Sequence, residues 1–236
     1  MPPKRACDLT LDERAAIIGK SDFGSTLSRY TLMEFAASST AYDYRRRRFI
    51  YSSGDAADAL YVIDHGRVKL CRIEEGTDRE AVIDILPAGS IFGDSALYAD
   101  GQRENCAMAY EQVRLVRIPV GEFKRGMAES HELYDYTFRL IGQRLSRAER
   151  RVADFALDAI PARLEKLLVD FSRRYGVNET EGVLIDIPLP HREIASIVGS
   201  TRESVTVRLN AMRREGIIDF VNRKILIKRP ESLAMF

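Results

Sequence analysis

Residues 191–216 read HREIASIVGSTRESVTVRLNAMRREG, a pattern that predicts two short helices joined by a tight turn. Ile194, Ala195 and Val198 share one face of the first helix, and Gly199 provides the turn. The second helix combines an N-cap with a buried face, formed by Thr201 and by Val205, Leu209 and Met212. Two helices with apolar faces and a glycine turn between them indicate a helix-turn-helix.

The start of the second helix carries side chains that suit the edges of DNA bases. Arg202 can donate to O6 and N7 of guanine, and Glu203 can accept from N4 of cytosine. Thr206 lies one turn further along the same face, so we expect these three residues to read bases. The residues expected to contact phosphates instead are Thr201, Ser204, Arg208, Arg223 and Lys224.

A β-hairpin is predicted after the second helix. Apolar residues at 217–221 and 224–228 flank residues 222–223, which predicts a wing with basic residues at its tip. Between residues 192 and 229, nine basic residues stand against four acidic ones, so this stretch carries +5 while the whole chain carries +1. Local positive charge suits a polyanion such as DNA, although a charge run is often only a solvated surface.

The first half of the chain has the pattern of a β-sheet domain. Short apolar runs at 59–63, 68–73, 81–86 and 113–118 alternate with breaks that contain glycine. Strands that recur about every ten residues, with turn signals between them, are typical of a jelly roll or a sandwich. Residues 1–35 are expected to form a loose or short-helical lead-in.

A long helix is predicted from about residue 130 to residue 160, where Pro161 ends it. Apolar residues keep the four-three spacing of a heptad seam along it, at Tyr134, Phe138, Ile141, Leu145, Ala148, Val152 and Phe155. We expect this seam to pair with the same seam of a second copy, so that the protein is a homodimer. The alternative is that the stripe packs on the chain's own β-domain, but Leu133 and Leu140 offer a separate face for that contact.

The predicted fold class is α+β: a β-roll sensor domain of the jelly-roll type, a coiled-coil dimerisation helix and a winged helix-turn-helix. The expected boundaries are 1–35 for the lead-in, 36–129 for the β-roll, 130–160 for the dimerisation helix and 161–236 for the DNA-binding domain. Hydrophobic residues make up 45% of the chain and charged residues 30%, as in an ordinary globular protein. The longest apolar runs fall far short of the ~20 residues of a membrane span, so no membrane contact is expected.

These motifs make the chain resemble the cyclic-AMP receptor protein/FNR superfamily of bacterial transcription regulators. The resemblance runs from about Phe35 to Ile227 and rests on residues 51–55 (YSSGD), 92–94 (FGD) and 197–205 (IVGSTRESV). It implies a cytoplasmic dimer that binds double-stranded DNA at a two-fold operator, with an effector in the β-roll that sets the DNA affinity. It also implies RNA polymerase as a further partner.

The resemblance assigns roles to single residues of the second helix. Arg202 and Glu203 match the arginine and the glutamate with which the family reads bases. A third base-reading arginine, common one turn later, is replaced here by Val207, and Arg208 beside it points about 100° away. The chain therefore departs from the family at the base that this position reads.

The effector pocket implied by the resemblance comprises Gly93, Asp94, Glu104, Asn105, Ala148 and Glu149. Members that bind cyclic nucleotides hold the cyclic phosphate with an arginine and a Ser or Thr, and these positions hold Glu104 and Asn105 here. A carboxylate repels a phosphate, and Arg103, one residue early in an extended segment, points to the opposite face. The Thr-Ser pair that contacts adenine corresponds to Ala148 and Glu149. We therefore expect that cyclic AMP does not bind, although Asp94 can still accept from a ribose hydroxyl.

No cofactor, metal site or catalytic site is expected. Cys7, Cys71 and Cys106 share no short spacing, and the N-terminal segment lacks the cysteine cluster that holds an iron–sulfur centre in FNR-like members. The three histidines lie far apart in the sequence, which argues against a haem site. No Ser/His/Asp or Cys/His set converges, so we expect that the protein is not an enzyme.

Two alternatives stay open at this point. The chain is either a DNA-binding regulator or a β-roll regulatory or interaction protein that does not bind DNA. If it binds DNA, the dimer is either ligand-independent or controlled by an unidentified small molecule in the β-roll. The arginine run at 45–48 is either a solvated edge or a contact for RNA polymerase.

Overall fold

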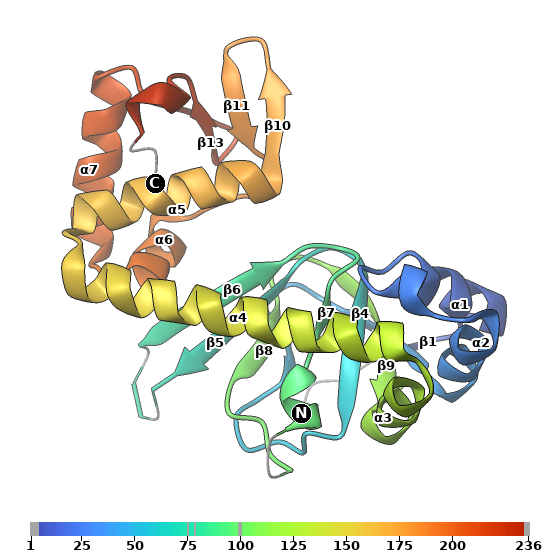
Figure 1. Cartoon of the computed structure of the whole chain (residues 1–236). Helices are drawn as coiled ribbons and strands as arrows, with labels where there is room; N and C mark the ends of the chain where they lie inside the picture. Colours follow the sequence, from blue (N-terminus) through green and yellow to red (C-terminus); the bar gives the residue numbers. More distant parts are fainter. Residues whose placement is uncertain (1–4, 75, 78, 99–100, 234–236) are drawn as a thin grey trace. The chain divides into compact units, whose positions relative to one another are not determined.

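The computed structural model describes residues 5–74, 76–77, 79–98 and 101–233 (Figure 1). The chain forms two compact units, 1–145 and 146–236, and the division between them falls inside the long helix. The sequence predicts a domain boundary further on, at residue 160. No helix among the described residues has both the length and the hydrophobicity to cross a bilayer.

The first unit is built from two antiparallel sheets. Its strands are β1 (Arg5–Cys7), β2 (Thr40–Tyr44), β3 (Phe49–Tyr51), β4 (Ala59–His65), β5 (Val68–Ile73), β6 (Glu80–Leu86), β7 (Ile91–Phe92), β8 (Cys106–Ala109) and β9 (Val113–Pro119). They are ordered β1-β2-β9-β4-β7 in one sheet and β3-β8-β5-β6 in the other. The helices are α1 (Leu11–Gly19), α2 (Arg29–Ser38), α3 (Val120–Glu129) and the long α4 (His131–Leu157), with the 3-10 turns η1 (Gly24–Thr26) and η2 (Asp94–Leu97). The predicted β-roll is confirmed.

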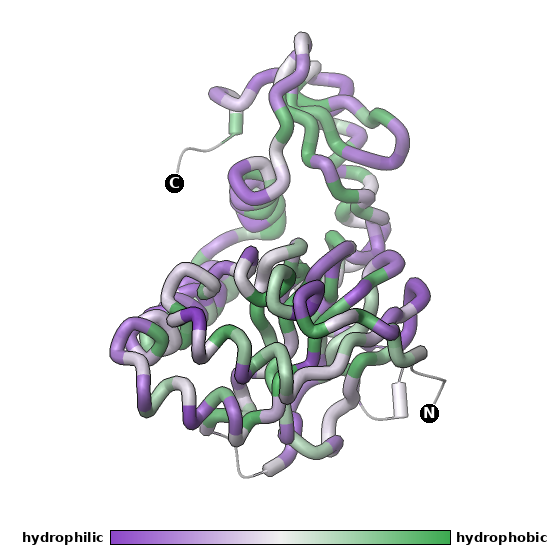
Figure 2. Tube along the Cα trace, turned by 90° about the vertical axis from the view of Figure 1, so that its right-hand side faces the viewer, coloured by the Kyte–Doolittle hydropathy of each residue, from purple (hydrophilic) through white to green (hydrophobic). Residues whose placement is uncertain are grey.

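Alternate side chains of β4 contribute to two different hydrophobic clusters. Tyr61 and Ile63 lie in the cluster that both sheets share, whereas Leu60 and Val62 lie in a second cluster. This second cluster joins the other face of the first sheet to the N-terminal helices. Figure 2 shows hydrophobic residues recurring along the strands. Successive side chains of a strand point to opposite faces, so an uninterrupted apolar run is what a strand buried on both sides needs.

The N-terminal segment belongs to this core. Helices α1 and α2 form there, as the expected short-helical lead-in, and Ile18, Phe23 and Phe35 are almost completely buried. A Cβ at Gly126 of α3 would come within 2.5 Å of the Phe35 ring, so α2 and α3 approach closely only because position 126 is glycine. The segment therefore stabilises the sheet domain and is more than a loose leader.

Helix α4 confirms the predicted long helix. Its residue Leu133 is completely buried, and Leu140 packs against the same cluster, as expected for the face that contacts the β-domain. The helix ends at Leu157, before the predicted end near residue 160. Pro161 lies in the first turn of the next helix, a position where its missing N–H costs nothing.

The second unit contains the end of α4 and a small mixed domain. Its further elements are α5 (Ile160–Tyr175), β10 (Gly176–Glu179), β11 (Gly182–Ile185), α6 (His191–Val198), α7 (Arg202–Arg214), β12 (Ile218–Val221), β13 (Lys224–Ile227) and the 3-10 turn η3 (Pro230–Ser232). The strands form one antiparallel sheet in the order β10-β11-β13-β12. The predicted helix-turn-helix with a hairpin wing is confirmed.

Candidate nucleic-acid interface

The turn between α6 and α7 is set by two residues. Gly199 adopts the left-handed conformation, with φ 63° and ψ 54°, which glycine enters without strain. The Thr201 side chain then caps α7 by accepting a hydrogen bond of 3.1 Å from the backbone N of Ser204. The buried face of α7 is the predicted one, with Val205, Leu209 and Met212 fully buried. The turn therefore holds the N-terminus of α7 in a fixed direction.

The Phe155 ring covers this turn. A Cβ at Gly199 would lie 2.5 Å from Cε1 of Phe155. The Arg163 guanidinium lies 4.8 Å from the centre of the same ring and donates to the Gly199 carbonyl over 3.4 Å. Phe155, predicted for the dimer seam, is 47% exposed and packs on its own chain. Sequence spacing alone did not indicate this contact, because the two residues are 44 positions apart.

Arg202 and Glu203 stand at the first turn of α7, and both side chains are exposed. The positive end of the helix dipole lies here, so the same turn also favours a phosphate nearby. This is the placement that the sequence predicts for base-reading residues.

Thr206 is placed differently from its neighbours. It is half-buried, its hydroxyl donates to the Arg202 carbonyl over 2.7 Å, and it lies 2.8 Å from Nδ1 of His191 on α6. Burial lowers the pKa of His191, and the positive charge of Arg202 adds to this shift. The Thr206 hydroxyl thus links the two helices, which sequence reasoning missed. Its reading of a base stays a prediction.

Two of the basic residues expected to contact phosphates form ion pairs with carboxylates of the same unit. Arg208 forms an ion pair of 2.7 Å with Glu165 of α5, and Lys224 forms one with Asp186. On binding DNA, each of these side chains would have to leave its carboxylate for a phosphate, or contact the carboxylate and the phosphate together. Thr201 and Ser204 are exposed at the start of α7, beside Arg202.

The wing forms as the sequence predicts. Asn222 and Arg223 both have positive φ, 50° and 66°, as a two-residue hairpin turn of type I′ requires. Arg223 is exposed at the tip. The wing therefore presents a cation beside the strand pair that carries it.

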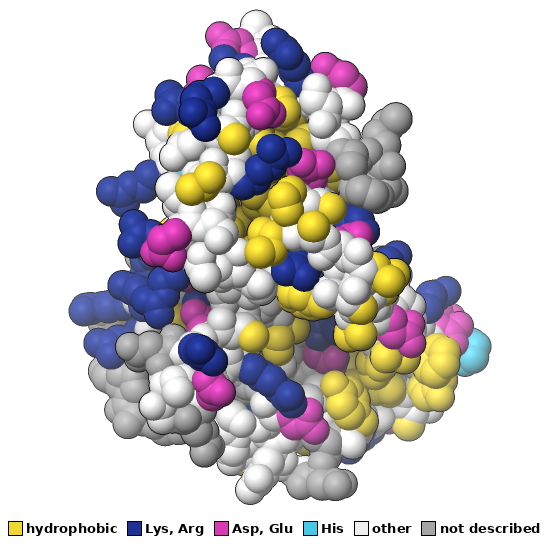
Figure 3. Space-filling view, turned by 90° about the vertical axis from the view of Figure 1, so that its left-hand side faces the viewer, with side chains coloured by type: hydrophobic (Ala, Val, Ile, Leu, Met, Phe, Trp, Pro, Cys, Tyr) yellow, Lys and Arg dark blue, Asp and Glu magenta, His cyan; other side chains and the backbone are white. Residues whose placement is uncertain are grey.

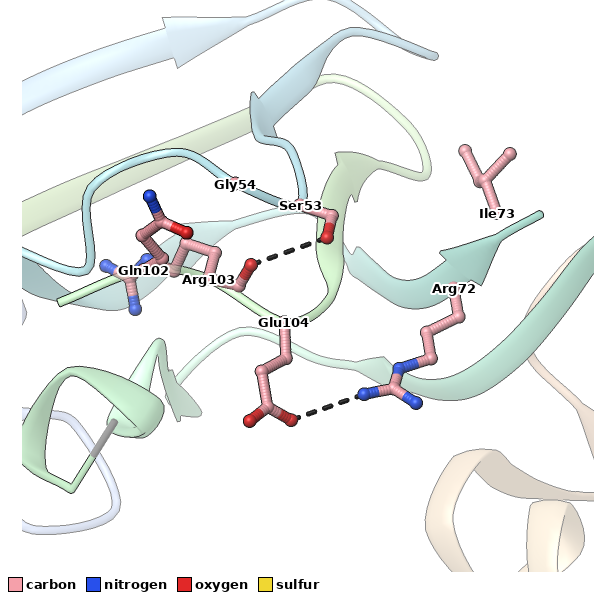
Figure 4. Close-up of a pocket in the computed structure, with 7 residues that line it drawn as sticks. All are labelled: Ser53, Gly54, Arg72, Ile73, Gln102, Arg103 and Glu104. Atoms are coloured by element: carbon pink, nitrogen blue, oxygen red, sulfur yellow. Dashed lines mark hydrogen bonds and ion pairs between the residues drawn. The ribbon is translucent and has the colours of Figure 1, made fainter. Parts of the chain in front are cut away.

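In the sheet domain, the direction of two neighbouring side chains corrects the expected effector pocket. The sequence predicts that Glu104 faces the pocket interior and that Arg103 faces away. The structure shows that Arg103 is only 2% exposed, whereas the Glu104 side chain is 73% exposed and pairs with Arg72 over 3.2 Å (Figure 4). The two neighbours still point in opposite directions, as expected for an extended segment, but Arg103 rather than Glu104 is the one that points inward.

The buried guanidinium of Arg103 is held by neutral groups. It donates to the carbonyl oxygens of Gly93 over 2.7 Å and of Ala59 over 2.5 Å, and it lies 4.5 Å from the centre of the Tyr51 ring. Its Nε has no hydrogen-bond partner among the residues that the structure describes. Arg103 therefore fills space at the inner side of the loop that begins at Gly93.

The other residues expected in the pocket have different surroundings. Asp94 is buried and forms an ion pair with Arg144 of α4, whose guanidinium also donates to the Ile91 carbonyl over 2.7 Å. The buried amide oxygen of Asn105 has no hydrogen-bond partner within the described part of the chain. Ala148 and Glu149 are exposed on α4. A separate pocket of about 600 Å³ is lined by Ser53, Gly54, Arg72, Ile73, Gln102, Arg103 and Glu104 (Figure 4).

Two of the cysteines face each other across the sheet. Cys71 on β5 pairs in register with Cys106 on β8, and both are buried thiols. Burial raises the pKa of the Cys71 thiol, and a hydrogen bond with Glu80 raises it further. Because the thiolate is the reactive form, this environment suits core residues. Among the described residues, no group of three or more His, Cys, Asp or Glu side chains is arranged to hold a metal ion.

The predicted seam of α4 is largely open to solvent. Exposed fractions are 71% for Phe138, 60% for Leu145 and 69% for Val152. Tyr134 is half-exposed at 51%, and Figure 3 shows hydrophobic side chains at the surface beside many basic ones. Large apolar side chains that recur on one helix face mark an interaction surface.

Both units resemble domains of known proteins. A model of the cyclic nucleotide-binding domain matches residues 42–130, and a model of the Crp-like helix-turn-helix domain matches residues 162–236. The chain is 28% identical, over 192 residues, to the CRP-like cAMP-activated global transcriptional regulator of Mycobacterium tuberculosis, covering 81% of this chain and 85% of that protein. It is 29% identical, over 193 residues, to the global nitrogen regulator of Nostoc sp., covering 81% and 86%.

Solved structures share the fold. CooA from Carboxydothermus hydrogenoformans superposes with a TM-score of 0.74 at 21% identity, covering 97% of this chain and 96% of that one. The global regulator CLP of Xanthomonas campestris superposes with a TM-score of 0.72 at 22% identity, covering 85% and 99%. With both domain models matched in order along one chain, and with relatives that extend across both, this protein belongs to the cyclic-AMP receptor protein/FNR family of transcription regulators.

Proposed function

We propose that this protein is a transcription regulator that binds a two-fold DNA operator as a homodimer. The observation that carries the proposal is the tip of α7, where Arg202 and Glu203 are exposed beyond a capped, buried helix-turn-helix. Such a tip fits the major groove, where a guanidinium reads guanine and a carboxylate reads cytosine. The protein acts where DNA and RNA polymerase are, in the cytoplasm.

The seam on α4 supports the dimer. An exposed stripe that contains Phe138, Leu145 and Val152 is costly in water and matches the heptad spacing of a two-stranded coiled coil. Two copies joined along it would present two α7 helices, which matches the symmetry of a palindromic operator.

The test compares two variants on an operator selected from random duplexes. Arg202→Ala should cost about 1–3 kcal/mol of specific binding and relax the base preference, since it removes a base contact. Lys224→Ala should weaken all sequences to a similar extent, because a phosphate contact carries no sequence information. Binding should also fall steeply with added salt. A protein that binds no duplex, or binds all duplexes equally, would refute the proposal.

We also propose that cyclic AMP is not an effector. Asp94 is committed to Arg144, and the Arg103 guanidinium is committed to backbone carbonyls, so a nucleotide that used either group would first have to break these contacts. Glu104 adds a negative charge at the mouth of the nearby pocket. Calorimetric titration should show no binding, and a micromolar dissociation constant would contradict the proposal.

RNA polymerase is proposed as a further partner, on the ground that transcription regulators of this family act at promoters. The exposed arginines at residues 45–48 offer a basic surface for it. Loss of transcriptional activation with DNA binding retained, after all four arginines are replaced by serine, would support this surface. Unchanged activation would refute it.

A further inference from the structure

The exposed face of α7 carries an apolar side chain, that of Val207. With 3.6 residues per turn, Val207 lies nearly opposite the buried face formed by Val205, Leu209 and Met212. Glu203, one turn earlier, lies on the same side. Val207 is 68% exposed, so the described residues of the second unit leave most of its side chain open. The centre of the exposed helix face is therefore a valine next to a base-reading carboxylate.

Val207 does little for the fold of the domain. A β-branched side chain loses rotamer freedom in a helix, so an exposed valine stabilises α7 less than the long polar residues around it would. Its methyl groups have no core to join, since they point into solvent. The side chain is suited to contact an external group.

The floor of the major groove offers one apolar group to such a side chain. Every base edge there presents hydrogen-bond donors or acceptors, and only thymine adds a C5 methyl. A valine that covers any other base would remove polar atoms from water without pairing them. We propose that Val207 contacts a thymine methyl in each half of the operator and thereby selects a T·A pair at that position. This inference rests on the proposed DNA-binding function.

The size of the effect follows from the burial of one methyl group. Removing a buried methyl should weaken binding about fourfold, and about 15-fold when both half-sites are changed. The contact is additive between half-sites because they are too far apart to share atoms. The effect is therefore large enough to measure by fluorescence anisotropy.

The experiment deletes the methyl from the DNA and from the protein separately. An operator is selected from random duplexes, and each thymine is replaced in turn by deoxyuridine, which lacks only the C5 methyl. The full-length protein should lose about fourfold in affinity for a replacement at either position of one symmetry-related pair, and about 15-fold when both positions are replaced. Val207→Ala should lose most of this discrimination between thymine and deoxyuridine at that pair, since its side chain ends at Cβ and lacks the two γ methyl groups that reach the base.

Matched controls separate this contact from general effects. Val177→Ala changes another exposed valine, 48% exposed on β10, and should keep the full thymine preference. Arg202→Ala should bind more weakly overall but keep the same preference at this pair. The inference would be overturned if no deoxyuridine replacement changed the affinity for the operator. It would also be overturned if Val207→Ala kept the full preference for thymine over deoxyuridine. Absence of binding to any duplex would instead overturn the proposed function.

Discussion

Replacing Gly199 by alanine tests how the helix-turn-helix is held together. The residue has φ +63°, where a Cβ costs about 1–2 kcal/mol. The new Cβ would also lie 2.5 Å from Cε1 of Phe155, so the ring has to move. Overpacking usually costs about 1–3 kcal/mol, and the low end applies because the Phe155 side chain is 47% exposed and therefore only partly enclosed. The two effects together predict a loss of about 2–3 kcal/mol in the free energy of unfolding.

The assay is urea unfolding followed by circular dichroism, with all variants at one protein concentration because a dimer's stability depends on it. Gly199→Asn should lose less of the free energy of unfolding than Gly199→Ala. Asparagine tolerates the left-handed region, so only the close contact of its Cβ with the Phe155 ring remains unfavourable. Gly121→Ala on α3 is the matched control. Its Cβ would meet no atom of the described residues within 4 Å, so the variant should be as stable as the parent or slightly more stable.

The same substitution in a Phe155→Ala variant separates the backbone strain from the contact with the ring. In Phe155→Ala, the substitution Gly199→Ala should cost only the backbone strain of about 1–2 kcal/mol. A Gly199→Ala protein as stable as Gly121→Ala would refute the strain argument. An undiminished cost in the Phe155→Ala background would refute the contact with the ring.

Three further predictions follow from the same structure. Replacing Ile141 and Leu145 together by glutamate should give monomers in analytical ultracentrifugation, and persisting dimers would contradict the seam. Because burial and Arg202 lower the pKa of His191 below its ordinary 6.5, the folded state favours the neutral ring, so the free energy of unfolding should fall as pH drops below about 6.5. His191→Gln should reduce this dependence, and an unchanged pH profile would exclude the histidine as its source. Arg103→Met should destabilise the first unit by about 1–3 kcal/mol in the same urea assay, because it leaves buried carbonyl groups without donors, and a neutral result would show that these groups do not need the guanidinium.

Features set by local spacing could be predicted from the sequence. The buried face of α7, the cap at Thr201 and the wing turn at residues 222–223 each depend on residues within one or two turns of each other. The strand at Val68–Ile73 was predicted with its observed bounds for the same reason. In these segments local preference and tertiary packing favour the same structure.

Features set by distant partners could not be predicted. The directions of Arg103 and Glu104 depend on how the segment after residue 101 joins β8, and a shift of one residue reverses them. The contact of the Phe155 ring with the turn at Gly199 and the ion pair of Arg208 with Glu165 could not be predicted either. The sequence contains no signal for such pairs, because their members lie more than 40 positions apart.

The open stripe on α4 has a consequence for dosage in the cell. If only the paired form recognises its operator, the amount of active protein rises with the square of the chain concentration wherever single chains predominate. A twofold change in synthesis would then give about a fourfold change in occupied promoters. Such a protein would respond to its own abundance more steeply than in proportion, even when no small molecule controls it.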